Sequence, residues 1–379
     1  MKKKILVTTG TRAEYGILRP LLEKIQKSKK LELLLVVTGT HLSKEHGYTI
    51  KEIIKDGFKI NFKIKMMPKL DSNYSMSLAL GEGIIYFSKC FKKLKPDINV
   101  ILGDRDEMLA SALAASHMNI INAHIHGGDI SGGLDEYNRH AITKISNIHF
   151  AATQKSKTRI LKMGENKKFV FLTGSPSIDE VKSKRISSKN ELEKKYKINF
   201  TGNEILLVQH PVTTESSETE KQILSTLLAL KKTGCNIIAI APNSDSGHRK
   251  IFKQYRNFSK TYNNFKFFHS LPREDYLGFL KNVHLLIGNS SSGLIEASFF
   301  HTPVVDIGIR QKNRERGPNV IHVKDFSSTK ISKILEKNLK KSHSSSSRIY
   351  GDGNASKKIV KILENLILNE NLIKKQISY

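Results

Sequence analysis

The stretch INVILGDRDEMLASALAASHMNIINAHIHGGD, residues 98–129, contains two short apolar runs separated by a helix-like segment. The runs cover 98–103 and 119–125, and EMLASALAASH lies between them at 107–117. Two strands joined through a helix run parallel, and a continuous apolar run is typical of a strand covered on both faces. Glycine and charged residues stand at the end of each run. The stretch therefore predicts a parallel α/β sheet whose polar strand ends meet at one edge.

The same alternation of apolar runs and helix-like segments extends in both directions. The other runs lie at 4–9, 31–38, 58–66, 148–153, 169–173, 204–210, 235–242, 265–270, 283–290, 302–308 and 319–323. A turn-rich segment, TGSPSIDEV at 173–181, interrupts the rhythm. We therefore expect the α/β class with two doubly wound parallel-sheet domains in tandem, a boundary near 173–180, and a closing helix at about 354–376.

Composition excludes several classes of protein. The 379 residues carry 63 Lys and Arg against 35 Asp and Glu, a net charge of +28. Trp is absent and no basic run is interleaved with aromatics, so we expect no nucleic-acid partner. The 2 cysteines, Cys90 and Cys235, are too few for a disulfide framework or a cysteine zinc site. No apolar run is long enough to span a membrane or to form a signal peptide, which predicts a cytoplasmic protein.

The strand end GTRAEYG, residues 10–16, places Arg12 in the first strand-to-helix turn. It lacks the G-x-G-x-x-G spacing of a dinucleotide site and the G-K-[ST] of a P-loop, so neither a nicotinamide-dinucleotide site nor a Walker ATPase is predicted. An arginine here can make a forked contact with a phosphate, and the alternative is a surface arginine at a turn.

A second strand end, GNSSSGLIEA at 288–297, runs into a helix. Ser290, Ser291 and Gly293 would lie at the helix N-terminus, where free backbone N–H groups and the helix dipole favour an anion. Serine is also a common N-cap, and a carboxylate such as Glu296 is favoured in the first turns in any case. Phosphate binding and plain capping therefore stay open as alternatives.

Two further strand ends carry candidate acid–base groups. In GDRDE, at 103–107, Asp104 comes first and is expected to point into a cleft. Asp106 and Glu107 are expected in the first turn of the following helix. His210 opens the segment HPVTT directly after an apolar run, and both a catalytic and a structural role are open for it.

The local pattern alone does not establish the role of the stretch that follows the run 119–125. A metal site would use His124, His126 and Asp129, but the two histidines share a side only if the strand continues, and no third histidine stands at ligand spacing. We therefore expect no metal and favour a ligand-facing wall. Farther on, one helix face at i, i+4 spacing carries Asp135, Glu136, Arg139, His140 and Lys144. The alternative for that face is a solvated, self-paired helix.

Taken in order, the strand-end motifs resemble one known family. They are TGTRAEYG, VTGTHLS, LGDRDEMLA, HIHGGDISGGLDEYNRHAITK, TGSPSID, HPVT, APNSDSG, IGNSSSGLIEA and GIRQKNRERG. The ordered set, which covers nearly the whole chain, resembles the hydrolysing UDP-N-acetylglucosamine 2-epimerases of the sialic and legionaminic acid pathways. The resemblance implies the GT-B architecture: Rossmann-like domains at 1–173 and 174–353 around a central cleft, with the C-terminal helix segment 354–379 joined to the first domain.

The resemblance also implies roles for individual residues. On the nucleotide side these are Arg12, Ser290, Ser291 and Gly293 for the diphosphate, Glu296 for the ribose, and Arg310. Around the sugar they are Asp104, Asp135, His210, Arg105, His140 and His41. His126 stands where many members have a catalytic Glu, which leaves His126, Asp129 and Asp135 as alternatives for that role. We expect Asp104 and Asp135 to be the acid–base carboxylates, with His210 and His126 assisting.

The implied reaction needs no redox cofactor, because proton transfer alone sets the stereocentre. A base removes the C2 proton, the nucleotide diphosphate leaves C1, and water adds to the 2-acetamidoglucal with inversion at C2. The product is N-acetylmannosamine or a 2,4-diacetamido analogue. UDP-GlcNAc is the default donor, with UDP-N,N'-diacetylbacillosamine and GDP-GlcNAc as alternatives, and a homodimer or tetramer is implied. A non-hydrolysing epimerase, a GT-B glycosyltransferase and a nucleotide-sugar-binding regulator are the competing hypotheses.

Overall fold

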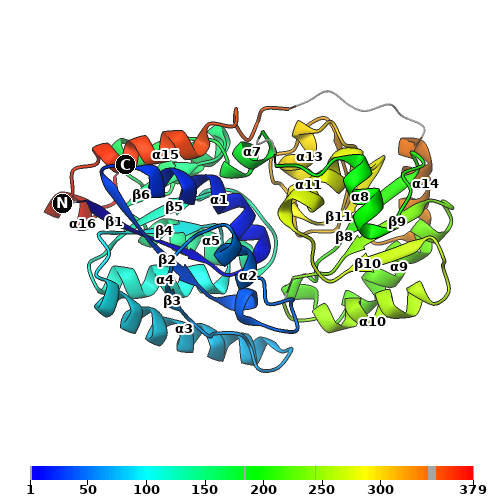
Figure 1. The fold of residues 1–379 in the computed structure, drawn as a ribbon, viewed down its shortest axis with the longest axis horizontal. Helices are drawn as coiled ribbons and strands as arrows, with labels where there is room; N and C mark the ends of the chain where they lie inside the picture. Colours follow the sequence, from blue (N-terminus) through cyan, green and yellow to red (C-terminus); the bar gives the residue numbers. More distant parts are fainter. Residues whose placement is uncertain (1, 183–184, 244, 340–346, 379) are drawn as a thin grey trace.

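The chain forms two parallel β-sheets, each flanked by helices, which lie side by side along the longest axis of the molecule (Figure 1). The structure is a computed structural model that describes residues 2–182, 185–243, 245–339 and 347–378. The first half of the chain builds the sheet on the left of Figure 1 and the second half the sheet on the right. The predicted α/β class with two Rossmann-like parallel sheets is confirmed.

The first sheet has the strand order β3-β2-β1-β4-β5-β6-β7, with all neighbouring strands parallel. Its strands are β1 (Lys3–Thr9), β2 (Leu31–Val37), β3 (Ile60–Lys63), β4 (Ile98–Leu102), β5 (Ile121–Ile125), β6 (Ile148–Ala151) and β7 (Val170–Leu172). The connecting elements are α1 (Arg12–Lys27), η1 (Gly39–Leu42), α2 (Ile50–Lys55), α3 (Asn73–Leu94), α4 (Asp106–His117), α5 (Leu134–Ile145), α6 (Gln154–Lys162) and η2 (Lys167–Phe169).

The second sheet has the order β10-β9-β8-β11-β12-β13 and is likewise parallel. Its strands are β8 (Glu204–Val208), β9 (Asn236–Ile240), β10 (Phe265–Phe268), β11 (Leu285–Gly288), β12 (Val304–Ile307) and β13 (Val320–Val323). The remaining elements of the second half are α7 (Pro176–Val181), α8 (Lys189–Tyr196), η3 (Thr213–Glu215), α9 (Thr219–Lys231), α10 (His248–Ser259), α11 (Arg273–Asn282), α12 (Ser291–Leu294), α13 (Glu296–Phe299) and α14 (Ser328–Leu339). The chain ends in α15 (Ala355–Asn365) and α16 (Glu370–Ile373), which pack on the first half.

Each sheet reverses its strand order beside its first strand, between β1 and β4 and between β8 and β11. Connections leave such a switch point in opposite directions, which opens a crevice at the carboxyl ends of the strands. Arg12 and Asp104 follow β1 and β4, and His210 and Ser290 follow β8 and β11. The topology therefore brings motifs that are far apart in the sequence to the two crevices.

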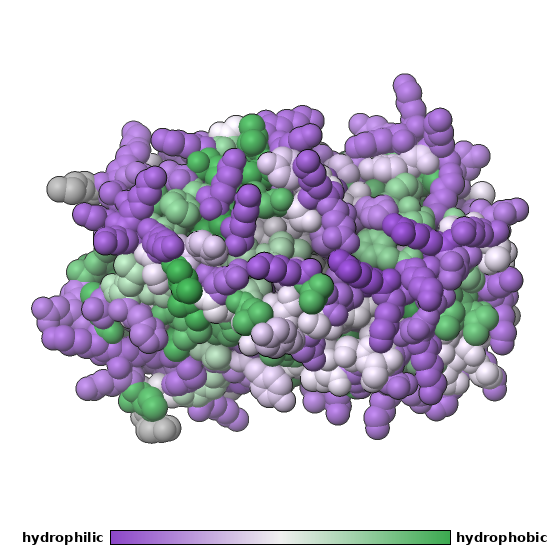
Figure 2. All heavy atoms as spheres, turned by 90° about the horizontal axis from the view of Figure 1, so that it is seen from below, coloured by the Kyte–Doolittle hydropathy of each residue, from purple (hydrophilic) through white to green (hydrophobic). Residues whose placement is uncertain are grey.

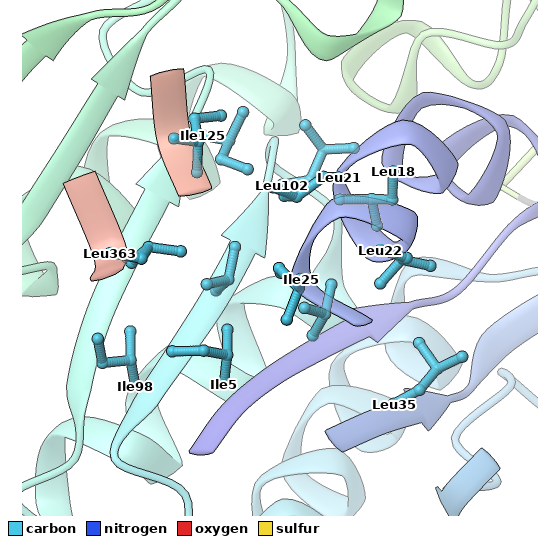
Figure 3. Close-up of a cluster of buried hydrophobic side chains, with 14 of the residues drawn as sticks. Ile5, Leu18, Leu21, Leu22, Ile25, Leu35, Ile98, Leu102, Ile125 and Leu363 are labelled. Atoms are coloured by element: carbon cyan, nitrogen blue, oxygen red, sulfur yellow. The ribbon is translucent and has the colours of Figure 1, made fainter. Parts of the chain in front are cut away.

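Helix α1 shows how packing fixes one of these strand ends. Its buried face includes Leu18, Leu21, Leu22 and Ile25, which Figure 3 shows over the strands of the first sheet. Fully burying a leucine or isoleucine side chain contributes about 1.5–3 kcal/mol. At its first turn the Thr11 side chain accepts a hydrogen bond from the Glu14 backbone N–H (3.2 Å), while the Glu14 carboxylate accepts from the Thr11 backbone N–H (2.9 Å). This capping box holds Arg12 at the sheet edge.

The C-terminal segment packs against the first half of the chain. Leu363 of α15 joins the core of the first sheet (Figure 3), and Lys3 Nζ donates to the Leu363 carbonyl oxygen (3.0 Å). The predicted helix over 354–376 is wrong from Leu366 onward, where the backbone is extended. The helix restarts as α16 because the Asn369 side chain caps it.

The surface seen in Figure 2 is mostly hydrophilic, as a lysine-rich chain predicts. Helix α3 nevertheless leaves Tyr74, Leu78 and Ile85 exposed. Within the part of the chain that the structure describes, no helix combines the length and apolarity that membrane crossing requires. The implied homodimer or tetramer and the cytoplasmic location stay predictions.

Candidate active site

A cleft with a volume of about 330 Å³ lies between the carboxyl ends of the two sheets. This volume is within the range of small-molecule sites in proteins. Both halves of the chain line it. The residues proposed from the sequence that line the cleft are Arg12, Asp104, Arg105, His126, Asp135, His210, Ser290, Ser291, Glu296 and Arg310.

Hydroxyl groups gather where β11 leads into α12. Ser290 caps α12, with its Oγ accepting from the Ser292 backbone N–H (3.4 Å) and lying 3.2 Å from Ser292 Oγ. Ser292 in turn hydrogen-bonds the Tyr276 hydroxyl, whose pKa burial raises to about 12. Gly293 lies outside the cleft lining: a Cβ there would lie 3.0 Å from Val304 Cγ1, so this glycine lets α12 pack on the sheet. The glycine at 293 is thus required by packing, and the expected contact of its backbone with a diphosphate stays a prediction.

Glu296, at the start of α13, is buried, and its carboxylate is hydrogen-bonded by two side chains of the protein. Its carboxylate accepts from Arg273 Nη2 and, at 2.5 Å, from the Ser177 hydroxyl of α7. Burial acts to raise the pKa of Glu296, but the charge of Arg273 and these hydrogen bonds outweigh it and lower the pKa. The Arg273 chain reaches Glu296 by lying against Gly16, where a Cβ would be 2.6 Å from Arg273 Cγ. An ionised carboxylate with a fixed orientation results.

Arg12 extends from the first half of the chain toward the second. Its Nε donates to Glu52 Oε2 (2.9 Å) and its Nη1 to the hydroxyl of Ser270 (2.7 Å), a residue that follows β10. Burial lowers the pKa of Arg12, although an arginine still remains charged at neutral pH. The guanidinium thus forms part of the cleft wall while it is held by one residue of each half.

Two carboxylates, Asp104 after β4 and Asp135 at the start of α5, line the same cleft. Asp104 pairs with Arg139, and Asp135 Oδ2 accepts from Arg310 Nη2 (2.9 Å). Burial raises the pKa of Asp135 to about 7, the charge of Asp104 adds to this, and Arg310 opposes it. Asp135 is therefore a carboxyl that can exchange a proton near neutral pH.

His210 is held in one tautomer. The Asn243 backbone N–H donates to His210 Nδ1 (3.0 Å), and the Asn289 side chain bonds both the N–H and the carbonyl of His210 (2.7 and 2.9 Å). Burial, together with the charges of Arg310 and Arg105, lowers the pKa of His210 well below its ordinary value. A neutral imidazole whose Nδ1 accepts carries its proton on Nε2, so His210 is a hydrogen-bond donor there.

His126 follows β5 in a left-handed backbone conformation (φ 65°), which is uncommon for a residue other than glycine. Its Nε2 lies 2.8 Å from Ser175 Oγ and its Nδ1 3.1 Å from Asp129 Oδ2. Arg139 Nη1 donates to the His126 carbonyl (3.0 Å). Neighbours on three elements therefore determine how His126 faces the cleft.

Three further candidate residues, Asp129, His41 and His140, lie outside the cleft lining, and their expected roles at the sugar stay predictions. Asp129 is buried between His126 and Arg314, with a 2.8 Å contact to Arg314 Nη2. His41 is buried between threonine hydroxyls in the tight turn η1, and burial lowers its pKa to about 3. His140 pairs with Glu136 one helical turn earlier (2.9 Å). All three side chains are engaged by neighbouring side chains in this structure.

The histidines that a metal site after β5 would use are instead hydrogen-bonded to separate protein groups. His124 Nε2 lies 2.7 Å from the Gly103 carbonyl and its Nδ1 3.2 Å from Thr143 Oγ1, whereas His126 contacts Ser175 and Asp129. Among the described residues, no group of at least three His, Cys, Asp or Glu side chains could hold a metal ion.

Local sequence reasoning missed several cleft residues. The sequence placed Arg139 on the charged face of α5, but it gave no indication that this arginine would contact Asp104 and the His126 carbonyl. Arg314 lies in the motif GIRQKNRERG without any feature that separates it from its basic neighbours. Arg273 had no signal at all, since only packing brings it to Glu296.

The sequence of the chain matches a known family. A sequence model of the family described as UDP-N-acetylglucosamine 2-epimerase matches residues 23–364. The chain belongs to this family.

Two epimerase relatives show how far the similarity extends. The chain is 37% identical over 382 residues to the UDP-N,N'-diacetylbacillosamine 2-epimerase (hydrolyzing) of Legionella pneumophila, with 100% of both chains covered. It is 36% identical over 320 residues to the UDP-N-acetylglucosamine 2-epimerase of Neisseria meningitidis, which covers 84% of this chain and 83% of the relative. The two relatives share the reaction named, 2-epimerisation, and differ in the sugar.

A solved epimerase structure has the same fold. The crystal structure of UDP-GlcNAc 2-epimerase from Neisseria meningitidis bound to UDP-GlcNAc aligns with a TM-score of 0.78 and 21% sequence identity. The alignment covers 95% of this chain and 99% of that chain. The likeness extends over both halves, which places the chain in the GT-B-like architecture expected from the resemblance.

Proposed function

We propose that this family member is a hydrolysing 2-epimerase, which converts a nucleotide-activated N-acetylated hexosamine into a free N-acetylmannosamine-type sugar and the nucleotide diphosphate. The observation that supports the proposal is the pair of carboxylates, Asp104 and Asp135, which line one cleft. Burial and the charge of Asp104 raise the pKa of Asp135 to about 7. A group whose pKa lies near ambient pH can both take up and return a proton in one reaction cycle. Epimerisation at C2 requires both events.

In the proposed first step a carboxylate takes the C2 proton, and the C2–H electron pair forms the C1–C2 double bond. The C1–O bond breaks with its electrons leaving on the nucleotide diphosphate, which gives a 2-acetamidoglucal. In the second step water adds its hydroxyl to C1, and a proton is returned to C2 from the opposite face. One water is consumed, and Asp104 and Asp135 supply the base and the acid.

The departing diphosphate needs donors and cations that are already oriented. We assign this role to Ser290, Ser291, Arg12 and Arg310, which line the same cleft as the carboxylates. His210 supports the step as a neutral Nε2–H donor, because Asn243 occupies its Nδ1. Glu296, ionised and oriented by Arg273, is suited to accept hydrogen bonds from the ribose hydroxyls.

The donor is a UDP sugar by default, and either UDP-GlcNAc or UDP-N,N'-diacetylbacillosamine fits the relatives' names. GDP-GlcNAc stays as an alternative. The product would supply sialic or legionaminic acid synthesis.

Reaction in D₂O tests the proposal. We expect UDP by ³¹P NMR together with a free sugar that carries deuterium at an inverted C2 by ¹H NMR. An intact epimerised nucleotide sugar would indicate a non-hydrolysing epimerase. A dependence on an added acceptor, with C2 retained, would indicate a glycosyltransferase. Binding without turnover of any donor would indicate a regulator, and each of these three results contradicts the proposal.

A further inference from the structure

A second, smaller cavity of about 30 Å³, which we name the side cavity, lies beside the cleft. Its walls come from the segment after β4, from α3 and α5, and from the segments that follow β8 and β9. Asp104 and Asp135, the residues proposed as base and acid, line the side cavity as well as the cleft. Each of them therefore borders two spaces, and the chemistry proposed above uses only one.

The size and the polar lining of the side cavity suit water. Its volume holds one or two water molecules, because each needs about 10–15 Å³ of such space and about two to four polar partners. Asn138 is only 6% exposed, and its Nδ2 donates to Asp106 Oδ1 (2.9 Å). From the residues that the structure describes, Asn138 Oδ1, Asp106 Oδ2 and Thr213 Oγ1 accept no hydrogen bond. All three residues line the side cavity, so these oxygens supply the partners that a water there needs.

The proposed reaction leaves the base and the acid in the wrong protonation states for a second turnover. The carboxylate that takes the C2 proton is protonated after the first step, and the carboxyl that returns a proton to the opposite face of C2 is ionised after the second. One proton must therefore leave the first group, and one must reach the second. While the sugar and the nucleotide diphosphate occupy the cleft, the side cavity is a space that Asp104 and Asp135 still border.

Asp106 is suited to exchange a proton with these two groups. Burial and the charge of Glu107 raise the pKa of Asp106 to about 6, and the pKa of Asp135 is about 7. Groups with similar pKa values pass a proton in either direction with little difference in free energy. Asn138 holds one oxygen of Asp106, which leaves the other oxygen for a water in the side cavity.

We propose that the side cavity binds water and forms a proton-return path, in which this water carries protons between Asp106 and the two carboxyls Asp104 and Asp135. Asp106 is a positioning residue in this path, because it acts on the two carboxyls only through the water. The inference rests on the proposed function and deepens it by naming the site that restores the base and the acid.

The proton count of this path closes. The O–H bond of the carboxyl that took the C2 proton breaks, this proton passes to the water, and the water passes a proton to the Asp106 carboxylate. Protonated Asp106 then returns a proton through the water to the carboxylate that has lost one. The remaining proton of the water that adds to C1 goes to the phosphate oxygen that is freed when the C1–O bond breaks. No other reactant is needed.

Filling the side cavity tests the path without altering a carboxyl. Ala79 of α3 lines the cavity and is 6% exposed, so Ala79→Leu puts an apolar side chain where water would bind. The donor is whichever of UDP-GlcNAc, UDP-N,N'-diacetylbacillosamine and GDP-GlcNAc the wild-type chain turns over fastest. We expect kcat to fall about 10-fold, whereas the rate of a single turnover, measured by rapid quench with enzyme in excess, stays within about 2-fold. Ser77→Leu, on the exposed face of α3, is the matched control and should change neither rate.

Removal of the Asp106 carboxylate tests the relay group. Asp106→Ala should also lower kcat about 10-fold with little change in the single-turnover rate, and added formate, a carboxylate small enough for the enlarged cavity, should restore most of the loss. Glu220→Ala is the matched control. Glu220 is likewise a first-turn carboxylate that accepts from an amide side chain, Gln254 Nε2 (2.6 Å), and it lines neither the side cavity nor the cleft. The control should show neither the loss nor the restoration.

The outcomes separate this inference from the proposed function. The melting temperature and the UDP dissociation constant check folding in each variant, and if one variant unfolds, the other decides. An unchanged kcat in a folded variant overturns the inference, and so does an equal fall of kcat and of the single-turnover rate, or a loss in Asp106→Ala that formate does not restore. Each of these results leaves the proposed function standing. Failure of the wild-type chain to release nucleotide diphosphate from any of the three donors overturns the proposed function itself.

Discussion

The carboxyl ends of the two sheets face the same cleft with opposite chemistry. The first sheet presents carboxyl groups, and one of them, Asp135, has its pKa raised to about 7. The second sheet presents serine hydroxyls at Ser290 and Ser291 and a neutral imidazole at His210, whose pKa burial lowers. Under the proposed function, proton transfer falls to carboxyl groups of the first half, whereas the second half supplies most of the groups proposed to hold the anion and Arg12 of the first half adds a cation to them.

Arginines cross the cleft and connect these two surfaces. Arg310 of the second half pairs with Asp135, and Arg105 of the first half lies 3.6 Å from Asp245 of the second. Each half therefore supplies an arginine that pairs with a carboxylate of the other half. A pair that spans the cleft lets occupancy of the anion side influence protonation of the carboxylate side.

The largest effect is expected from removal of the carboxylate of Asp135. Asp135→Asn should lower kcat by about 10³-fold, since a general acid–base group contributes roughly 10²–10⁴-fold. The dissociation constant of UDP, measured by calorimetry, should change much less than kcat, because Asp135 is not among the residues proposed to hold the diphosphate. Glu136→Gln, whose carboxylate pairs with His140 outside the cleft lining, is the matched control. A comparable loss in the control would refute the assignment.

The next largest effect is expected from removal of the cation that the first half contributes to the proposed diphosphate site. Arg12→Ala should weaken UDP binding by about 10- to 100-fold, which corresponds to one or two charge-assisted hydrogen bonds. Lys24→Ala, an exposed change on the same helix, should leave affinity unaltered. Isothermal titration with UDP gives both values. An unchanged affinity in Arg12→Ala would remove Arg12 from the diphosphate site.

The third prediction concerns the pH dependence of turnover. If Asp135 acts as the base it must be ionised, so kcat/KM should rise with pH and level off above about 7. Arg310→Met removes the cation that lowers this pKa, so the midpoint should move up by about 1 pH unit. Arg256→Met, exposed on α10, should leave the midpoint in place. If the midpoint of the pH profile is the same in Arg310→Met, a group other than Asp135 controls the pH dependence.

The smallest expected effect is on stability. Folding raises the pKa of Asp135 from 3.8 to about 7, so the folded chain keeps this proton to a higher pH than the unfolded chain does. Stability is therefore lost as pH rises through that window, and Asp135→Asn avoids the loss. The variant should be more stable by on the order of 1 kcal/mol at pH 8, with little difference at pH 4. Urea denaturation at the two pH values measures this, and a destabilised variant at pH 8 would contradict it.

Strand ends were the most informative feature of the sequence. Asp104, His210 and Ser290 each follow an apolar run, and each lines the cleft. His41 also follows a strand but lies outside the cleft lining, because the chain after β2 forms the tight turn η1 and directs the imidazole inward to threonine hydroxyls. Position at a strand end thus places a residue near the crevice, and the local turn decides where its side chain points.

Periodicity and motifs in the sequence indicated most strands and helices, the order of the polar strand ends and the family, but they predicted the last helix too long. The partners of the charged groups came from packing alone: Arg139 for Asp104, Arg310 for Asp135, and Arg273 for Glu296. Hydrophobic periodicity depends on residues a few positions apart, whereas the Arg310–Asp135 pair is separated by 175 residues. Such pairs exist only after the two sheets have packed, and in this chain they set the protonation of the groups proposed for catalysis.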